Sequence, residues 1–275
     1  MNIENVKTTV SKPVTQVLAG VALALLGTTS ALAASTWNVD KCPISGTGTG
    51  TSCNVNAVAG GNSVTATAYA LGGTTASSTF VTATLLQHGV DSGLGVKAPL
   101  ESETSPQHTM DNSGKTELIA FHFDTAVILD AVTMGWTSSD MDFTLMAYTG
   151  VGAPTIVGKT LATLPTPTGA TGWSLVTNYG DVDTSSGYVA SGTNQTVKVN
   201  VPPSNISSSW WLISAYNSGY GAGPLDTLAD YMKIMTLASR DPVTPPPTPV
   251  PEPGSLTLIG VALMGFVASR RCKKS

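Results

Sequence analysis

The sequence predicts an all-β protein whose main domain is an antiparallel β-sandwich of the jelly-roll type. Short runs of alternating apolar and polar residues, rich in valine and threonine, recur between residues 64 and 238. Turns rich in glycine and proline separate these runs. No stretch of this part has the 3.6-residue period of an amphipathic helix. Short strands at such spacing are typical of a sandwich.

The alternation places each expected strand. We expect strands over residues 64–71, 80–87, 117–123, 126–136, 143–148, 173–179, 188–190, 196–201, 210–216 and 231–238. The clearest pair is 117–123 with 126–136. In the first of these, Leu118, Ala120 and His122 should face one side, and the residues between them the other. We expect turns over 35–61, a long connection over 89–112 and a glycine-rich loop over 217–224.

The N-terminus has the layout of a secretory signal peptide. Lys7 and Lys12 precede an apolar run over residues 17–26, and Ala31 and Ala33 provide a small-x-small cleavage site. This layout implies passage through the secretion translocon. The alternative is an N-terminal membrane anchor, but the short apolar core and the cleavage site that follows it favour a signal peptide.

The C-terminus has three parts in a fixed order. The first is a rigid, extended peptide around one charge, and it consists of Pro251, Glu252, Pro253 and Gly254. The second is an apolar run over 256–268, which we expect to form a short hydrophobic helix. The third is a basic cluster that stops at the cytoplasmic side of a membrane, and it consists of Arg270, Arg271, Lys273 and Lys274. The run is shorter than the about 20 residues of a spanning helix, so hydropathy alone also allows a marginal tail anchor.

These three parts resemble the PEP-CTERM sorting signal of Gram-negative bacteria. The resemblance implies recognition by exosortase, a membrane-embedded cysteine protease or transpeptidase, and removal of the tail near the Pro-Glu-Pro sequence. It also implies a precursor held in the inner membrane before processing and a product at the cell surface or in the extracellular matrix.

Residues 89–238 are similar to exosortase-dependent surface proteins. The similarity lies mainly in the segments 105–112, 117–124, 140–148 and 211–217. It implies an exported β-rich domain with no assigned enzymatic activity. The exosortase system implies association with extracellular polysaccharide or a biofilm matrix.

Four segments follow from these features. We expect a signal peptide over 1–34, a β-sandwich surface domain over 35–240, a proline-rich linker over 241–250 and the sorting signal over 251–275. An extended proline-rich linker advances about 3.1 Å per residue, so it holds the domain roughly 30 Å from the tail.

The charge of the body excludes two kinds of partner. Between Ala34 and Val250 there are seven lysines and arginines against fifteen aspartates and glutamates. Nucleic acid needs a basic face, so we expect no nucleic-acid binding. The same negative charge argues against adhesion to anionic lipid.

Two of the three cysteines lie in the exported part. Cys42 and Cys53 enclose a short loop, and a disulfide between them is the expected state outside the cytoplasm. It would stabilise the domain by about 2–3 kcal/mol in the chain-entropy model. Cys272 lies in the basic tail, where we expect a free thiol.

The sequence assigns no catalytic residue. The motifs of serine hydrolases, zinc proteases, phosphate loops and dinucleotide sites are missing from it. His108 with Asp111 and either Glu101 or Glu103 can make an acid/base or metal group on the long connection. The alternative is that Asp111 and its neighbours cap a turn before the 117–123 strand. His122 and Asp124 share a strand face, where a cross-strand hydrogen bond is the simpler role.

Two Asp-x-Asp pairs are weak candidates for Ca²⁺, which takes six to eight oxygen ligands. They are Asp140 with Asp142 and Asp181 with Asp183. The alternative is that these are solvated acids of turns, and no other metal or cofactor is expected. Four tryptophans either form a sugar-stacking platform or belong to the core, and they are Trp136, Trp173, Trp210 and Trp211.

Three functions remain. The first is a non-catalytic surface or matrix protein processed by exosortase. The second is a carbohydrate-binding module of the biofilm matrix, which needs an exposed aromatic beside polar residues. The third is a secreted hydrolase, which needs two carboxylates, or His108 with a carboxylate, converging in one pocket. We rank them in that order.

Overall fold

The computed structural model describes residues 35–44, 49–59, 62–87, 92–102, 108–166, 170–180, 189–191, 196–202, 205–221 and 225–240. The predicted signal peptide, linker and sorting signal lie outside these residues, and so does the predicted C-terminal helix. The same holds for five site candidates, which are Ala31, Ala33, Glu103, Asp181 and Asp183.

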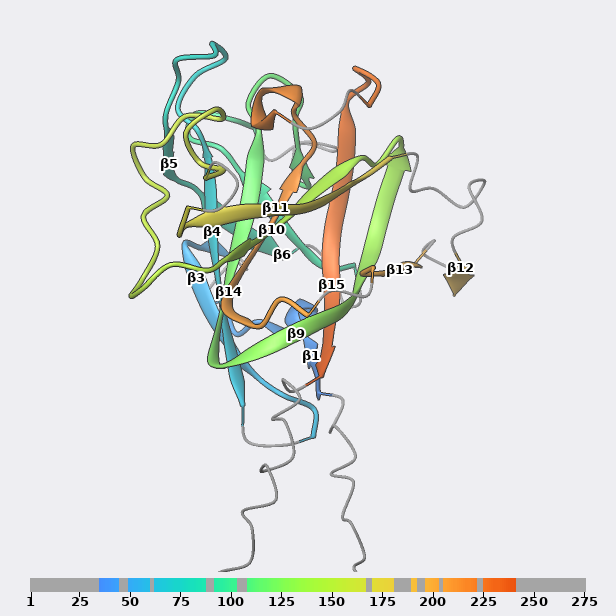
Figure 1. Cartoon of the computed structure of the whole chain (residues 1–275). Helices are drawn as coiled ribbons and strands as arrows, with labels where there is room; N and C mark the ends of the chain where they lie inside the picture. Colours follow the sequence, from blue (N-terminus) through green and yellow to red (C-terminus); the bar gives the residue numbers. More distant parts are fainter. Residues whose placement is uncertain are drawn as a thin grey trace, which may run out of the picture. The chain divides into compact units, whose positions relative to one another are not determined.

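The described residues form an antiparallel β-sandwich, as predicted (Figure 1). Its strands are β1 (Ser35–Asn38), β2 (Thr49–Gly50), β3 (Ser52–Asn56), β4 (Ser63–Leu71), β5 (Phe80–Thr82), β6 (Thr84–Gln87), β7 (Leu94–Lys97), β8 (Met110–Asp111), β9 (Glu117–Ser139), β10 (Phe143–Tyr148), β11 (Trp173–Tyr179), β12 (Val189–Ser191), β13 (Thr196–Asn200), β14 (Ser208–Ala215) and β15 (Asp230–Arg240). Two short 3₁₀ turns, η1 (Val39–Lys41) and η2 (Ser218–Tyr220), join them. Within this part of the chain, no helix has the length and apolarity needed to cross a membrane.

β9 is the strand on which both sheets are built. Its first half pairs with β4 and β14 in one sheet, and its second half pairs with β13 and β15 in the other. Figure 1 shows this strand in green, bending from one sheet into the other. The prediction of two separate strands over 117–123 and 126–136 is therefore wrong. No glycine or proline lies between the two predicted strands, and each half of β9 has partners elsewhere in the chain.

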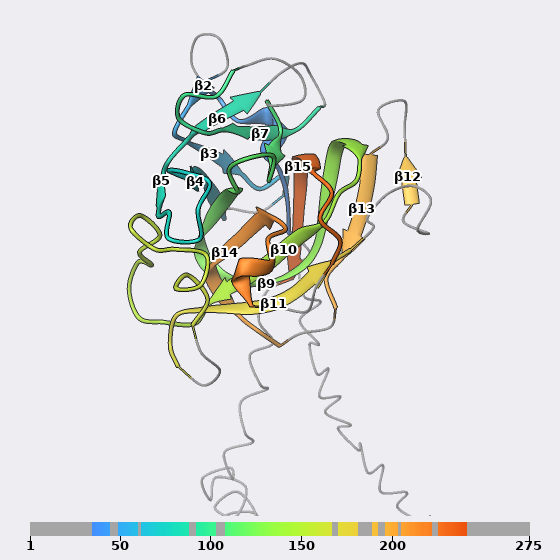
Figure 2. The same ribbon diagram turned by 90° about the horizontal axis from the view of Figure 1, so that it is seen from above.

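The first sheet has the order β11–β10–β14–β9–β4, with β3 and β5 paired to the far edge of β4. In the second sheet, β12, β13, β9 and β15 lie side by side. β1, β7 and β8 pair with β15, and β6 and β2 continue from β7. Figure 2 shows β2, β6 and β7 together on one side of the domain and β13 on the other.

The core follows the alternation along the strands. In β9, Ile119, Phe121 and Phe123 join the main core, which also takes residues of the second sheet such as Ile234 and Leu237. Leu118 and Ala120 face the other way and join a second cluster. That cluster is completed by apolar residues of the β10–β11 connection, which are Ile156, Leu161 and Leu164. The predicted two-sided pattern is confirmed, and the connection covers the outer face of the first sheet.

Several short strands were missed by the prediction. The turn-rich region 35–61 holds β1, β2 and β3, and the long connection 89–112 holds β7 and β8. Strands of two to five residues give too little alternation to be seen in a sequence. Their pairing with distant strands, such as β1 with β15, forms them instead.

Candidate functional site

Acidic side chains gather where the ends of β8, β9 and β15 meet. Tyr231 of β15 pairs with Asp111 of β8, and Asp230 forms a parallel bridge with Asp140 just after β9. The carboxylates gathered there are Glu101, Asp111, Glu117, Asp140, Asp142, Asp226 and Asp230. They form two neighbouring groups, which differ in burial and in hydrogen bonding.

The first group, the aspartate cluster, consists of Asp140, Asp142 and Asp226. One carboxylate oxygen of each lies within 4.8 Å of the other two. Asp140 and Asp142 are buried in the β9–β10 connection, whereas Asp226 is exposed in the loop before β15. The structure thus adds Asp226 to the predicted Asp140–Asp142 pair. Oxygen ligands at this spacing suit a hard cation such as Ca²⁺, and binding there remains a prediction.

Asp230 is hydrogen-bonded to the backbone of the aspartate cluster. It is buried, and one carboxylate oxygen accepts a hydrogen bond of 2.6 Å from the Asp142 backbone N–H. The other oxygen accepts from the Asn112 side-chain amide. Burial raises the pKa of Asp230 to about 8, the hydrogen bond from Asp142 opposes the rise, and the negative charges of the aspartate cluster add to it.

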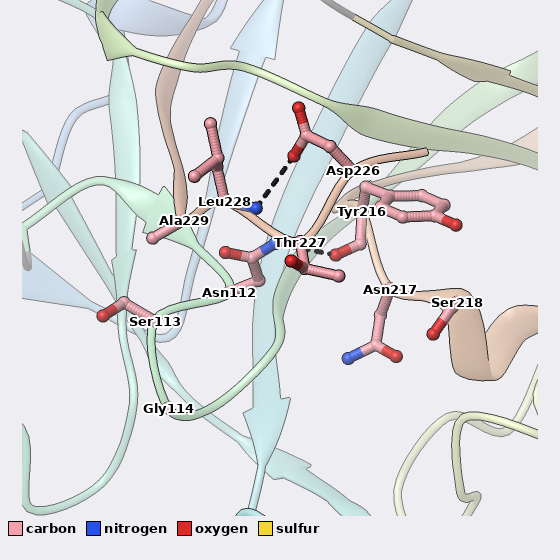
Figure 3. Close-up of a pocket in the computed structure, with 10 residues that line it drawn as sticks. All are labelled: Asn112, Ser113, Gly114, Tyr216, Asn217, Ser218, Asp226, Thr227, Leu228 and Ala229. Atoms are coloured by element: carbon pink, nitrogen blue, oxygen red, sulfur yellow. Dashed lines mark hydrogen bonds between the residues drawn. The ribbon is translucent and has the colours of Figure 1, made fainter. Parts of the chain in front are cut away.

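A polar pocket of about 380 Å³ opens beside this group (Figure 3). Asn112, Tyr216 and Asn217 line it, together with Asp226 and its neighbours. Of the seven gathered acids, only Asp226 is part of the lining. The predicted hydrolase alternative needs two carboxylates, or His108 with a carboxylate, in one pocket, and it stays a prediction.

The second group is the Glu101–Asp111–Glu117 cluster. Each member has one oxygen that accepts from a backbone N–H: Ala98 to Glu101 at 3.0 Å, Ser113 to Asp111 at 2.8 Å, and Asp111 to Glu117 at 3.1 Å. The bond from Ser113 is the turn cap that the sequence offered as an alternative role for Asp111. The structure brings Asp111 and Glu101 together and adds Glu117, which reads in the sequence only as the first residue of a strand.

Burial and like charges raise the pKa of two carboxyl groups in this cluster. Asp111 and Glu117 are fully buried. Burial, and then the negative charge of Glu101, raise the pKa of Asp111 to about 7. Burial and the charges of Asp111 and Glu101 hold the pKa of Glu117 well above its usual range.

Two of the histidines lie beside tryptophan rings. His122 stacks on Trp210 at 4.1 Å between ring centroids, and His108 lies 6.4 Å from Trp136. Asp124 accepts a 2.7 Å hydrogen bond from the Ser63 hydroxyl, and this bond lowers the pKa of Asp124. His88 lies outside the described part of the chain.

The four candidate tryptophans do not form one exposed platform. Trp173 and Trp211 are buried. Trp210 is half-buried with His122 stacked on it, and Trp136 is half-buried with the Lys233 ammonium 5.8 Å from its ring centre. Trp210 and Trp211 lie on opposite faces of the first sheet, as alternation requires.

A disulfide joins two segments of the main core. Cys42 and Cys53 are joined, with their Cα atoms 5.7 Å apart, and both are buried in the main core. The bond ties the segment after η1 to β3, an edge strand of the first sheet.

Comparison with known protein families identifies the C-terminal tail. Residues 249–271 match the family model of the PEP-CTERM protein-sorting motif. The predicted sorting signal is thus confirmed, and the motif supports a surface or secreted protein that is targeted to exosortase. No curated protein and no solved structure matches the chain. The similarity expected for residues 89–238 therefore stays a prediction.

Proposed function

We propose that this chain is a non-catalytic protein of the cell surface or extracellular matrix, secreted through the translocon and processed by exosortase near the Pro251-Glu252-Pro253 sequence. The sorting motif at residues 249–271 is the observation that carries this proposal. The inner membrane holds the precursor until the tail is removed, and the β-sandwich is the part released.

Features of the β domain support a location outside the cytoplasm. The Cys42–Cys53 disulfide suits an oxidising compartment. The chain carries few charges, 11% of its residues, with a formal net charge of −4. An acidic domain of this kind stays dispersed near other anionic polymers, because like charges repel. Association with extracellular polysaccharide, the finer part of the proposal, then needs polar contacts or bridging cations.

Intact-mass analysis of the protein from cells with and without exosortase tests the processing. We expect the tail after residue 253 to be lost only where exosortase is present. Glu252→Ala should keep the tail attached, because the charge between the two prolines is removed from the recognition peptide. Asp241→Ala, which removes a carboxylate outside the matched residues, is the control and should be processed normally.

Retention of the tail in both strains would remove the processing step and leave a tail anchor as the role of the apolar run. Binding of the purified protein to matrix polysaccharides on a glycan array tests the partner separately. Silence across that array would limit the proposal to delivery and location.

A further inference from the structure

A second pocket, of about 500 Å³, lies at the connection between β10 and β11. Pockets that hold small ligands have volumes of about 300–1,000 Å³. Tyr148, the last residue of β10, and Trp173, the first residue of β11, line it, and their ring centroids are 5.5 Å apart. The lining also includes four threonines, which are Thr155, Thr163, Thr166 and Thr171. The pocket thus brings aromatic side chains and hydroxyl groups together.

Hydrogen bonds and burial fix the connection that carries this pocket, which lies beside β5 (Figure 1). Three of its apolar residues are buried in the second cluster, as described above. The Lys159 carbonyl accepts a 2.7 Å hydrogen bond from the Phe80 N–H of β5. Near the other end of the connection, the Thr166 N–H donates to the Trp173 carbonyl. A binding site whose backbone is held in this way loses little freedom when a ligand enters.

Lys159 is the one charged residue among the described residues that line the pocket. Its side chain is exposed and makes no ion pair with any other residue that the structure describes. The chain as a whole has a formal net charge of −4, yet no aspartate or glutamate belongs to this lining. The charge of the pocket therefore complements an anion, and an ammonium forms strong hydrogen bonds with a carboxylate.

The lining also contains a donor in need of an acceptor. Trp173 is only 3% exposed, and its indole N–H donates to no acceptor in the described part of the chain. Buried donors are nearly always paired in folded proteins. An oxygen atom of a ligand in the adjoining pocket can accept from this N–H.

We propose that this pocket binds a carboxylate-bearing sugar unit of an extracellular polysaccharide. The Lys159 ammonium pairs with the sugar carboxylate. Threonine hydroxyls both donate and accept, which suits the hydroxyl groups of a sugar ring. Tyr148, which is half-buried, provides an apolar ring face for the C–H groups of the sugar. The inference rests on the proposed association with extracellular polysaccharide and adds the site and the class of sugar.

Calorimetric titration of the full chain with oligogalacturonate tests the site. EDTA in the buffer removes bridging cations, so that only direct contacts are measured. We expect the wild type to bind this acidic oligomer and to bind a neutral galactose oligomer of the same length more weakly. Sodium acetate at an equal carboxylate concentration should not displace the oligogalacturonate, because acetate lacks the hydroxyl groups.

Variants of the lining locate the site. Lys159→Met should weaken binding of the acidic oligomer about fivefold, the upper range for an exposed ion pair. Lys159→Arg keeps the charge and should stay within about twofold of the wild type, because the guanidinium also pairs with a carboxylate. Ala162→Trp, at an exposed position of the lining, should block the pocket and abolish binding. Lys198→Met, at an exposed position of β13 outside the lining, is the control and should bind as the wild type does.

Three results would overturn the inference, and they are distinguishable from failure of the proposed function. Equal binding by the wild type, Lys159→Met and Ala162→Trp would place the sugar elsewhere on the domain and leave the association intact. Equal affinity for the acidic and the neutral oligomer would overturn the class of sugar. Absence of wild-type binding to either oligomer would overturn the site, and the glycan array described above would then decide whether the domain binds polysaccharide.

Discussion

At the scale of single residues, the domain carries an ionisable group in an unfavourable place. Lys233 of β15 is only 3% exposed, and its ammonium lies over the Trp136 ring. Burial lowers the pKa of this lysine to about 8. The unfolded chain holds the proton up to a pH near 10.5, so the charge costs stability below pH 8, and this cost disappears as the pH rises from 8 to 10.5.

Lys233→Met should therefore raise stability at pH 7, and its advantage should shrink toward pH 10.5. We expect on the order of 1–2 kcal/mol, less than the full pKa shift implies, because the face of the Trp136 ring attracts the ammonium. Urea unfolding at several pH values measures it. Lys198→Met, at an exposed position of β13, is the control, and equal pH profiles for the two variants would contradict the account.

At the scale of elements, the close approach of β7 to the segment before β8 depends on one glycine. A Cβ atom added to Gly95 would clash with the His108 carbonyl oxygen. It would also lie 2.9 Å from the carbonyl carbon of His108. Backbone atoms cannot yield as a flexible side chain can. Gly95→Ala should thus cost about 2–4 kcal/mol, measured by urea unfolding followed by tryptophan fluorescence.

Gly72→Ala is the matched control, because its new carbon would be no closer than 3.4 Å to any atom. It should change stability by less than about 0.5 kcal/mol. A Gly95→Ala protein as stable as this control would show that β7 and β8 do not lie as described.

The disulfide links the segment after η1 to β3. Replacing both Cys42 and Cys53 by serine should lower the free energy of unfolding by about 2–3 kcal/mol. A reducing agent should likewise lower the urea midpoint of the wild type. It should lower the midpoint of Cys272→Ser by the same amount, because this variant keeps the disulfide. An unchanged midpoint under reduction would mean that the bond does not stabilise the domain.

Strands were predictable where alternation is long enough to read. The bounds expected for β10 and β11, 143–148 and 173–179, agree with the structure. β9 was divided wrongly, because Asp124 and Thr125 look like turn residues. In the structure Asp124 binds Ser63 of β4, and the strand continues through it. Strand continuity here depends on a partner far away in the sequence.

At the scale of the whole molecule, the sorting of the protein was easier to predict from the sequence than its molecular activity. Sorting signals are read as linear peptides, so their order and spacing are visible in the sequence. The acidic groups are different. Asp140 and Asp142 stand out as a pair, but Asp226 and Glu117 become site candidates only when the fold brings distant loops together.

The location of the β domain outside the cytoplasm is the central claim. Fractionation of the producing cells, with thiol labelling and mass analysis of each fraction, tests this directly. We expect the chain outside the cytoplasm, without its N-terminal signal and with Cys42 and Cys53 joined. Intact precursor in the cytoplasm with both thiols labelled would contradict the account.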